Sequence, residues 1–220
     1  MDREFPRLLG DVGGTNARWA WQPQAGAPIE RVRSLPCAAF DAIDACIAQY
    51  LKVEGLPAPR CAAFGIATPI TGDAVQMTNH PWRFSIAALQ ARLGVERLLV
   101  LNDFEALAQA VPALAGDALR AVGGGSGGGD GGGIAGGGNL AVIDPGTGLG
   151  VAGLVADGRG GWTTVVGEGG HVTLAASSAR EASLLAILRE RFGHASAERA
   201  LSGPGLVNLY AAGWHRCRAQ

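Results

Sequence analysis

The stretch that decides the fold is LLGDVGGTNARWA, residues 8–20. An apolar run leads through Asp11 into a turn of small residues, and a second apolar run follows. This pattern predicts two antiparallel strands of a β-hairpin. Paired glycines let the backbone approach a ligand and direct several N–H groups toward a phosphate. The alternative is a plain Gly-Gly hairpin, and this turn alone favours that alternative.

A second stretch, AVIDPGTGLGVAG at residues 141–153, repeats the design. Asp144 aligns with Asp11, and Gly146 aligns with Gly13. Two copies of one hairpin predict duplicated domains facing each other across a cleft, with both turns holding the phosphates of one nucleotide. Coincidence is the alternative because glycine accounts for 35 of the 220 residues, but the shared aspartate and the flanking strands favour a repeat.

Hydrophobic patterns predict the remaining elements. Strands are expected at residues 29–35, 61–67, 74–77, 97–101, 140–143, 150–154 and 162–166. Helices are expected after residue 40, after Ser85 as N-cap, after Asp103, and over residues 179–192 between a Ser178/Glu181 capping box and Gly193. Short helices should follow through Tyr210, and the last residues, GWHRCRAQ, show no periodicity.

A glycine-rich segment divides the chain. Residues 123–138 hold twelve glycines in sixteen positions, so no core can form there. We therefore expect an N-terminal domain over residues 1–118, a linker or loop over 119–139, and a partial C-terminal domain over 140–220.

Composition excludes several classes of function. The formal net charge is −1 and no basic block is present, which argues against a nucleic-acid partner. Neither a signal peptide nor a membrane-spanning stretch is evident, so a cytoplasmic protein is expected. The four cysteines (Cys37, Cys46, Cys61 and Cys217) are widely spaced, as free thiols in a reducing compartment are, and a structural zinc site is improbable.

Polar residues with catalytic or ligand-binding chemistry stand at three other places. Asn102 and Asp103 follow a buried strand, where a carboxylate can deprotonate a hydroxyl group. The alternative is that Asp103 only caps the next helix. Glu168 and His171, in GEGGH, suit a polyhydroxylated ligand, with a plain surface turn as the alternative. Glu198 is either a further ligand or a solvated residue in the first turn of a short helix.

Six ordered motifs resemble the bacterial glucokinase family, within the hexokinase and actin-like ATPase superfamily. They are GDVGGTNAR, ATPITGD with MTNHPWRFS, LNDFEALA, PGTGLGVAGL, GEGGH and SAERALSGPGLVNLY, and they extend from about Leu8 to Tyr210. The resemblance implies an α/β fold of duplicated actin-like, ribonuclease H-like domains with mixed sheets. It also implies transfer of the γ-phosphoryl group of ATP, with Mg²⁺, to the 6-hydroxyl of glucose.

The resemblance assigns roles by motif. Asp103 is the implied catalytic base, and the implied sugar-binding residues are Asn102, Asp103, Glu168, His171 and Glu198. The implied nucleotide-binding residues are Gly10, Asp11, Val12, Gly13, Gly14, Thr15, Gly146, Thr147 and Gly148. Asp11 is also the candidate for Mg²⁺, directly or through water.

The sequence departs from the family pattern at Asp144, in the glycine-rich segment and in length. Family members continue well past Tyr210, so the second domain is expected to be incomplete, through truncation or a frame shift. The alternatives are an inactive remnant that binds sugar weakly, and a sugar kinase or sugar-responsive regulator of the repressor-type group, whose Cys-rich zinc motif is not found after His171. The hexose, the phosphoryl donor and the oligomeric state, monomer or homodimer, stay open.

Overall fold

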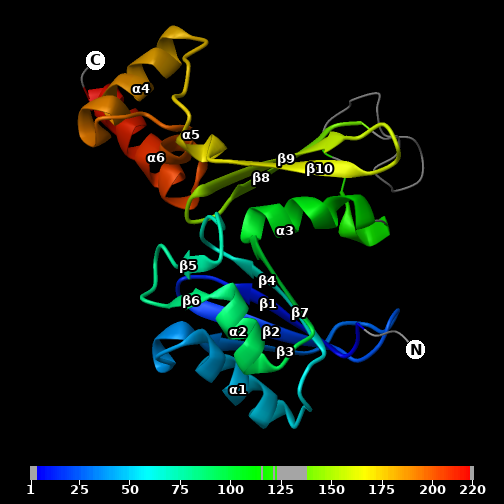
Figure 1. The fold of residues 1–220 in the computed structure, drawn as a ribbon. Helices are drawn as coiled ribbons and strands as arrows, with labels where there is room; N and C mark the ends of the chain where they lie inside the picture. Colours follow the sequence, from blue (N-terminus) through cyan, green and yellow to red (C-terminus); the bar gives the residue numbers. More distant parts are fainter. Residues whose placement is uncertain (1–3, 115, 121, 123–137, 219–220) are drawn as a thin grey trace. The chain divides into compact units, whose positions relative to one another are not determined.

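The computed structural model describes residues 4–114, 116–120, 122 and 138–218. It divides into two compact units, Met1–Ala106 and Leu107–Gln220 (Figure 1). The boundary falls inside helix α3 (Asp103–Ala110). The domain limits at 118 and 140 stay predictions, because most of the glycine-rich segment lies outside the described residues.

Unit 1 is built on a five-stranded sheet with the order β3-β2-β1-β4-β7. Strands β1 (Arg7–Val12), β2 (Asn16–Gln22) and β3 (Glu30–Pro36) form an antiparallel meander. Strands β4 (Cys61–Ile66) and β7 (Arg97–Asn102) run parallel to β1. The predicted mixed sheet is confirmed, and each strand lies within a residue or two of its predicted limits.

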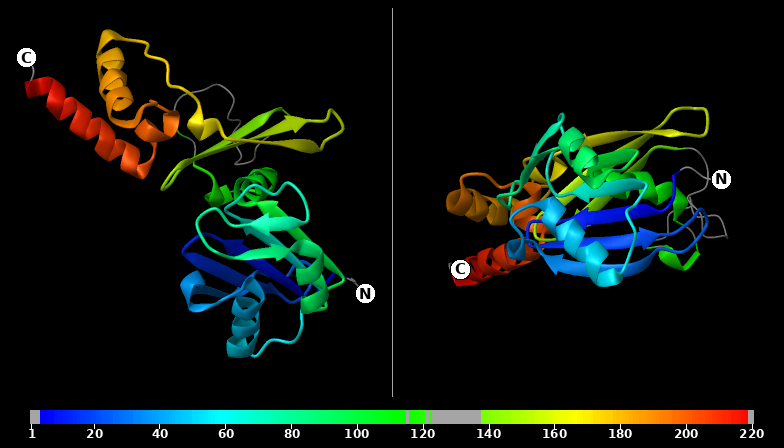
Figure 2. Two further views of the ribbon diagram at one scale, coloured as in Figure 1. Left: turned by 60° about the vertical axis from the view of Figure 1, so that its left-hand side comes forward. Right: turned by 60° about the horizontal axis from the view of Figure 1, so that its bottom comes forward.

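Helices α1 (Ile43–Glu54) and α2 (Ile86–Leu93) cover one face of this sheet (Figures 1 and 2). A short hairpin of β5 (Ala74–Gln76) and β6 (Arg83–Ser85) precedes α2. The predicted cap is confirmed, since the Ser85 side chain accepts a hydrogen bond from the Ala88 N–H. A 3₁₀ turn, η1 (Cys37–Ala39), joins β3 to the α1 region.

The core of unit 1 contains an aromatic pair that leaves no room for a side chain on Gly10. Trp19 and Phe64 meet edge to face, with ring centroids 5.2 Å apart. A Cβ atom on Gly10 would lie 2.5 Å from Trp19 Cζ3 and 2.8 Å from Phe64 Cδ1. Gly10 therefore has a packing role, whatever its role toward a nucleotide.

We expect Gly10→Ala to destabilise unit 1 by about 1–3 kcal/mol, because overpacking a tight core forces aromatic side chains out of place. Chemical denaturation should show a lower unfolding midpoint. Gly72→Ala is the matched control, since a Cβ there would meet nothing within 4 Å. Equal midpoints for the two variants would contradict the packing role.

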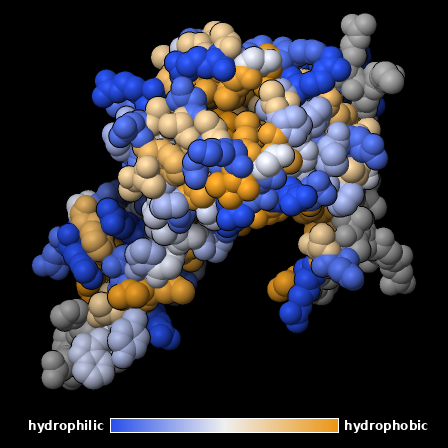
Figure 3. All heavy atoms as spheres, turned by 90° about the horizontal axis from the view of Figure 1, so that it is seen from below, coloured by the Kyte–Doolittle hydropathy of each residue, from blue (hydrophilic) through white to orange (hydrophobic). Residues whose placement is uncertain are grey.

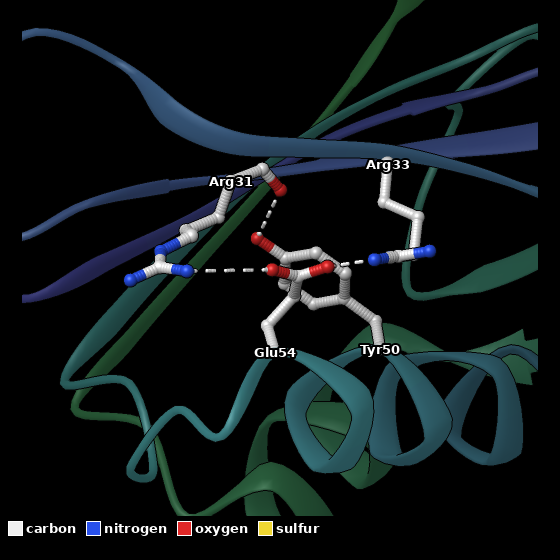
Figure 4. Close-up of polar contacts among 4 residues, drawn as sticks. All are labelled: Arg31, Arg33, Tyr50 and Glu54. Atoms are coloured by element: carbon white, nitrogen blue, oxygen red, sulfur yellow. Dashed lines mark hydrogen bonds and ion pairs between the residues drawn. The ribbon is translucent and has the colours of Figure 1, made fainter.

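A polar cluster joins β3 to α1 (Figure 4). The Tyr50 hydroxyl donates to the Arg31 carbonyl at 3.0 Å, and Glu54 lies 2.5 Å from Arg33 Nε and 4.0 Å from Arg31. Burial, with the Glu54 charge adding to it, raises the pKa of Tyr50 to about 12. These bonds secure Arg31, whose φ of 54° lies in the left-handed region that side chains disfavour.

Unit 2 contains a three-stranded antiparallel sheet in the order β10-β9-β8. The strands are β8 (Leu140–Pro145), β9 (Leu149–Ala156) and β10 (Trp162–Gly167). They repeat the meander of β1, β2 and β3, with Asp11 and Asp144 each the next-to-last residue of the first strand. The internal repeat seen in the sequence therefore corresponds to one supersecondary unit present twice.

The helices of unit 2 follow the sheet. They are α4 (Ala179–Phe192), α5 (Ala197–Leu201) and α6 (Gly203–Arg218), with 3₁₀ turns η2 (Val111–Ala113), η3 (Gly116–Ala118) and η4 (Gly169–His171) earlier in the chain. The predicted limits of α4 are confirmed. In its capping box, Ser178 accepts from the Glu181 N–H as expected, and the Glu181 carboxylate accepts from the N–H and the hydroxyl of Ser177.

The sequence predicts short helices through Tyr210 and shows no periodicity in the GWHRCRAQ tail, whereas the structure has one longer helix across this region. Helix α6 continues as one helix to Arg218, and its apolar face packs on α4 and α5 through residues such as Leu188, Leu209 and Ala212. This packing stabilises the part of α6 that precedes the tail, and the tail extends the same helix.

None of the described helices is both long enough and apolar enough to cross a bilayer. On the face drawn in Figure 3, hydrophobic side chains lie among hydrophilic ones. The three described cysteines, Cys37, Cys46 and Cys61, are buried free thiols, as expected. The fourth, Cys217, lies where side chains are not described.

Candidate functional site

Three strands of unit 1 end in one row. Val12 on β1 pairs in register with Ile66 on β4, which pairs with Asn102 on β7. The residues after each strand therefore gather at one edge of the sheet. There the Ala67 N–H donates to the Val12 carbonyl at 2.9 Å. The carboxyl edge of a sheet is the usual place for ligands in α/β proteins.

The structure assigns the helix cap to Asn102, not to Asp103. Asn102 Oδ1 accepts from the N–H groups of Phe104, at 3.0 Å, and Glu105, at 3.3 Å. Asn102 Nδ2 donates to the Thr68 carbonyl at 3.2 Å and to Asp103 Oδ1 at 2.9 Å. Asn102 therefore starts α3 and orients the neighbouring carboxylate with the same amide group.

The Asp103 carboxylate is half-buried. Its Oδ1 accepts hydrogen bonds from Asn102 Nδ2 at 2.9 Å and from the Phe104 N–H at 3.0 Å, and neither of these two bonds uses Oδ2. The Asp103 backbone N–H also stabilises the ionised carboxylate. Burial is the largest influence and raises the pKa of Asp103, the negative charge of Asp11 raises it further, and the hydrogen bonds oppose both.

Removing the Asp11 charge by Asp11→Asn should lower the pKa of Asp103, because a like charge disfavours ionisation. The Cγ chemical shift of Asp103, followed by NMR against pH, should show a midpoint above the ordinary value of 3.8 in the parent chain. The midpoint should move to lower pH in the variant. Asp41→Asn, at an exposed carboxylate of the same unit, is the control, and an unmoved midpoint in Asp11→Asn would contradict the interaction.

The first glycine turn, Gly13 to Thr15, is fixed from two sides. The Gly13 N–H donates to the Asn16 carbonyl at 2.9 Å, and the Cys37 N–H donates to the Thr15 carbonyl at 2.9 Å. A Cβ on Gly14 would lie 2.8 Å from Asn79 Cβ, so a glycine is needed for this approach. Asn79 belongs to the MTNHPW motif, and its place beside the turn was not foreseen from the sequence.

Asp11 lies one residue before the end of β1 and is exposed. Its cross-strand partner is Arg18, with Arg18 Nη1 3.5 Å from Asp11 Oδ2. Both line a surface hollow together with Gly65, Leu101 and Ala106. Among the described residues, no three His, Cys, Asp or Glu side chains cluster as a metal site, so Asp11 is a single carboxylate that a cation would share with other ligands.

The second glycine turn, in unit 2, is tied to Glu198. The Gly146 N–H donates to the Gly148 carbonyl at 3.0 Å, and the Gly203 N–H donates to the Gly146 carbonyl at 2.9 Å. Glu198 Oε2 accepts from the Leu149 N–H at 3.1 Å, and a Cβ on Gly148 would collide with that oxygen. Glu198 is therefore not simply a solvated helix residue, because its carboxylate lies against the turn.

The GEGGH segment packs on the same strand. A Cβ on Gly169 would lie 2.7 Å from Val151 Cβ, and one on Gly170 would collide with the Leu149 carbonyl. Glu168 and His171 are exposed, with His171 Nε2 3.6 Å from Glu168 Oε2. Around Leu149 the fold thus brings together three sequence-predicted parts of unit 2: the second turn, Glu198 and the Glu168–His171 segment.

Gly148→Ala should displace the Glu198 carboxylate and break its bond to Leu149. Hydrogen exchange at the Leu149 amide should become faster, since the acceptor is lost. Gly146→Ala is the matched control, because a Cβ there would meet nothing within 4 Å. If Leu149 stays equally protected in both variants, Gly148 does not determine the position of Glu198.

Four other residues have simpler surroundings. Trp82 is a buried core residue, and its indole N–H donates to the Phe40 carbonyl at 2.9 Å. His80 packs against Trp82, with ring centroids 4.7 Å apart. His194 pairs with the Thr173 hydroxyl at 2.8 Å. Asp144 is exposed on β8.

Strand order and site together define the class: an α/β protein of the actin-like ATPase fold, with a glycine turn after the first strand of each repeated meander.

The glucokinase family model matches residues 8–220. The chain is 52% identical to a glucokinase of Aromatoleum aromaticum over 94% of its own length, and 46% identical to one of Paramagnetospirillum magneticum over 93%. Its structure resembles a crystal structure of glucokinase from an Antarctic psychrotroph, with a TM-score of 0.76, 34% identity and 94% of this chain covered.

The chain therefore belongs to the glucokinase family. It spans 61% and 62% of the two curated relatives, and 63% of the chain in that crystal structure.

Proposed function

We propose that the protein transfers the γ-phosphoryl group of ATP to the 6-hydroxyl of glucose, giving glucose 6-phosphate and ADP. The observation that carries the proposal is the Asp103 carboxylate, which stands just past the end of β7 and whose Oδ1 is held by Asn102 Nδ2 and the Phe104 N–H. A base oriented in this way suits the deprotonation of an alcohol.

In the proposed reaction, Asp103 Oδ2 accepts the proton of the 6-hydroxyl as that oxygen attacks the γ-phosphorus. The bond between the γ-phosphorus and the β–γ bridging oxygen breaks, and its electron pair leaves with ADP. The raised pKa of Asp103 makes its ionised carboxylate a stronger base than that of an ordinary aspartate. Asn102, Glu168, His171 and Glu198 are the other proposed sugar-binding residues.

The glycine turns are the proposed phosphate sites. Residues 10–15 are assigned to the nucleotide in unit 1, as are Gly146, Thr147 and Gly148 in unit 2. Glu198 already accepts from the Leu149 N–H. A phosphate would therefore bind to other N–H groups of the second turn. This chemistry requires positioning and charge neutralisation more than covalent help.

A magnesium ion fits Asp11. Mg²⁺ is typically held by one or two carboxylates, with phosphate oxygens and waters filling its other positions, and Asp11 is a single exposed carboxylate near the first turn. The ion would neutralise charge on the phosphates. Arg18, which pairs with Asp11, would then be free to bind elsewhere.

Asp103→Asn should lower kcat by on the order of 10²–10⁴, the usual contribution of a general base. Glucose affinity should change little, since the amide preserves the shape of the side chain. A coupled assay for glucose 6-phosphate measures the first, and calorimetry with glucose measures the second. Asp41→Asn is the control with an exposed aspartate.

Near-normal turnover of Asp103→Asn would overturn the assignment of the base. Glucose binding by the parent chain without any turnover would support the alternative of a sugar-binding, inactive protein. A parent chain that neither binds glucose nor forms glucose 6-phosphate would overturn the proposed function.

A further inference from the structure

Thr68 lies at the centre of the hydrogen bonds behind Asn102 and Asp103. It is the residue before Pro69 in the ATPITGD motif, and it is 4% exposed. Its hydroxyl donates to the Gln76 carbonyl at 3.0 Å and lies 3.1 Å from the Thr78 hydroxyl. Because a threonine hydroxyl has one proton, Thr78 is the donor in the second bond. The Thr68 hydroxyl thus donates one hydrogen bond and accepts another within the protein.

The carbonyl of the same residue accepts from Asn102 Nδ2 at 3.2 Å. Its direction is set from two sides. Residues before proline are confined to extended backbone conformations, and the Thr68 N–H donates to the Ile66 carbonyl at 2.7 Å. The hydroxyl bonds then anchor Thr68 to the β5 strand and the residues that follow it, so the peptide between Thr68 and Pro69 cannot turn freely.

We propose that Thr68 is a positioning residue for the base: its hydroxyl fixes the Thr68 carbonyl, which holds the Asn102 amide, which holds Asp103 Oδ1. The expected loss of turnover rests on the proposed function. The series of hydrogen bonds from Thr68 to Asp103 does not. Thr68 acts through Asn102 and has no assigned contact with a substrate. The consequence is that the segment carrying Thr78 is coupled to the base through partly buried hydrogen bonds.

Thr68→Val removes the hydroxyl and keeps the branched shape, and Thr68→Ser is the matched variant that keeps the hydroxyl. We expect Thr68→Val to lower kcat by on the order of tenfold, since small misplacements of a catalytic group have large effects, and Thr68→Ser to restore most of it. In an Asn102→Ala background, Thr68→Val should have almost no further effect, because the residues act in series.

An NMR measurement on the full chain tests the bonds without turnover. The side-chain amide signals of Asn102, identified by their loss in Asn102→Ala, should shift and exchange faster in Thr68→Val and stay near the parent values in Thr68→Ser. Circular dichroism and thermal unfolding would show whether Thr68→Val folds. If it does not fold, Thr68→Ala takes its place, with the same expected result.

Unchanged Asn102 signals in a folded variant without the hydroxyl would overturn the inference. The inference would also be overturned if Thr68→Val lowered kcat by the same factor in the parent chain and in the Asn102→Ala background. A parent chain without turnover would overturn the proposed function instead, and the NMR comparison would still decide the role of Thr68.

Discussion

The organisation of unit 1 depends on the parallel pairing of β1, β4 and β7, which places Val12, Ile66 and Asn102 in one row. Parallel strands end at the same edge, so residues far apart in the chain are delivered to one place. Gly65 lies close to the start of α3, where an added Cβ would be in ordinary van der Waals contact with the Asp103 Cα atom at 3.5 Å and with Ala106 Cβ at 3.4 Å. Helix α3 begins directly at the end of β7 and carries the proposed base.

Asn102 shows how one polar side chain can serve both folding and chemistry. Its oxygen caps α3, and its nitrogen bridges the Thr68 carbonyl and the Asp103 carboxylate. A capping residue satisfies backbone donors that are otherwise unpaired at a helix start. The local stability of α3 and the orientation of Asp103 therefore depend on the same amide group.

The repeated meander serves the two units differently. In unit 1 the turn is supported by Cys37 and by close contact with Asn79. In unit 2 the turn is supported by Glu198 and the start of α6. The same strand–turn–strand unit therefore has different neighbours in the two units. Glycine is needed at position 148 because a side chain there would collide with the Glu198 carboxylate.

Local patterns in the sequence predicted most of the strands, caps and glycine turns, because these features depend on residues close together in the chain, and the six ordered motifs indicated the family. Asp103 was among the candidate site residues, but the sequence left open which residue caps α3, since Asn102 and Asp103 are both good caps. It also missed the continuous α6, whose stability comes from packing. Only the tertiary structure decided which residues support the turns and the base. Thr68, Asn79 and Glu198 reach their partners across long stretches of chain, and no local pattern encodes such contacts.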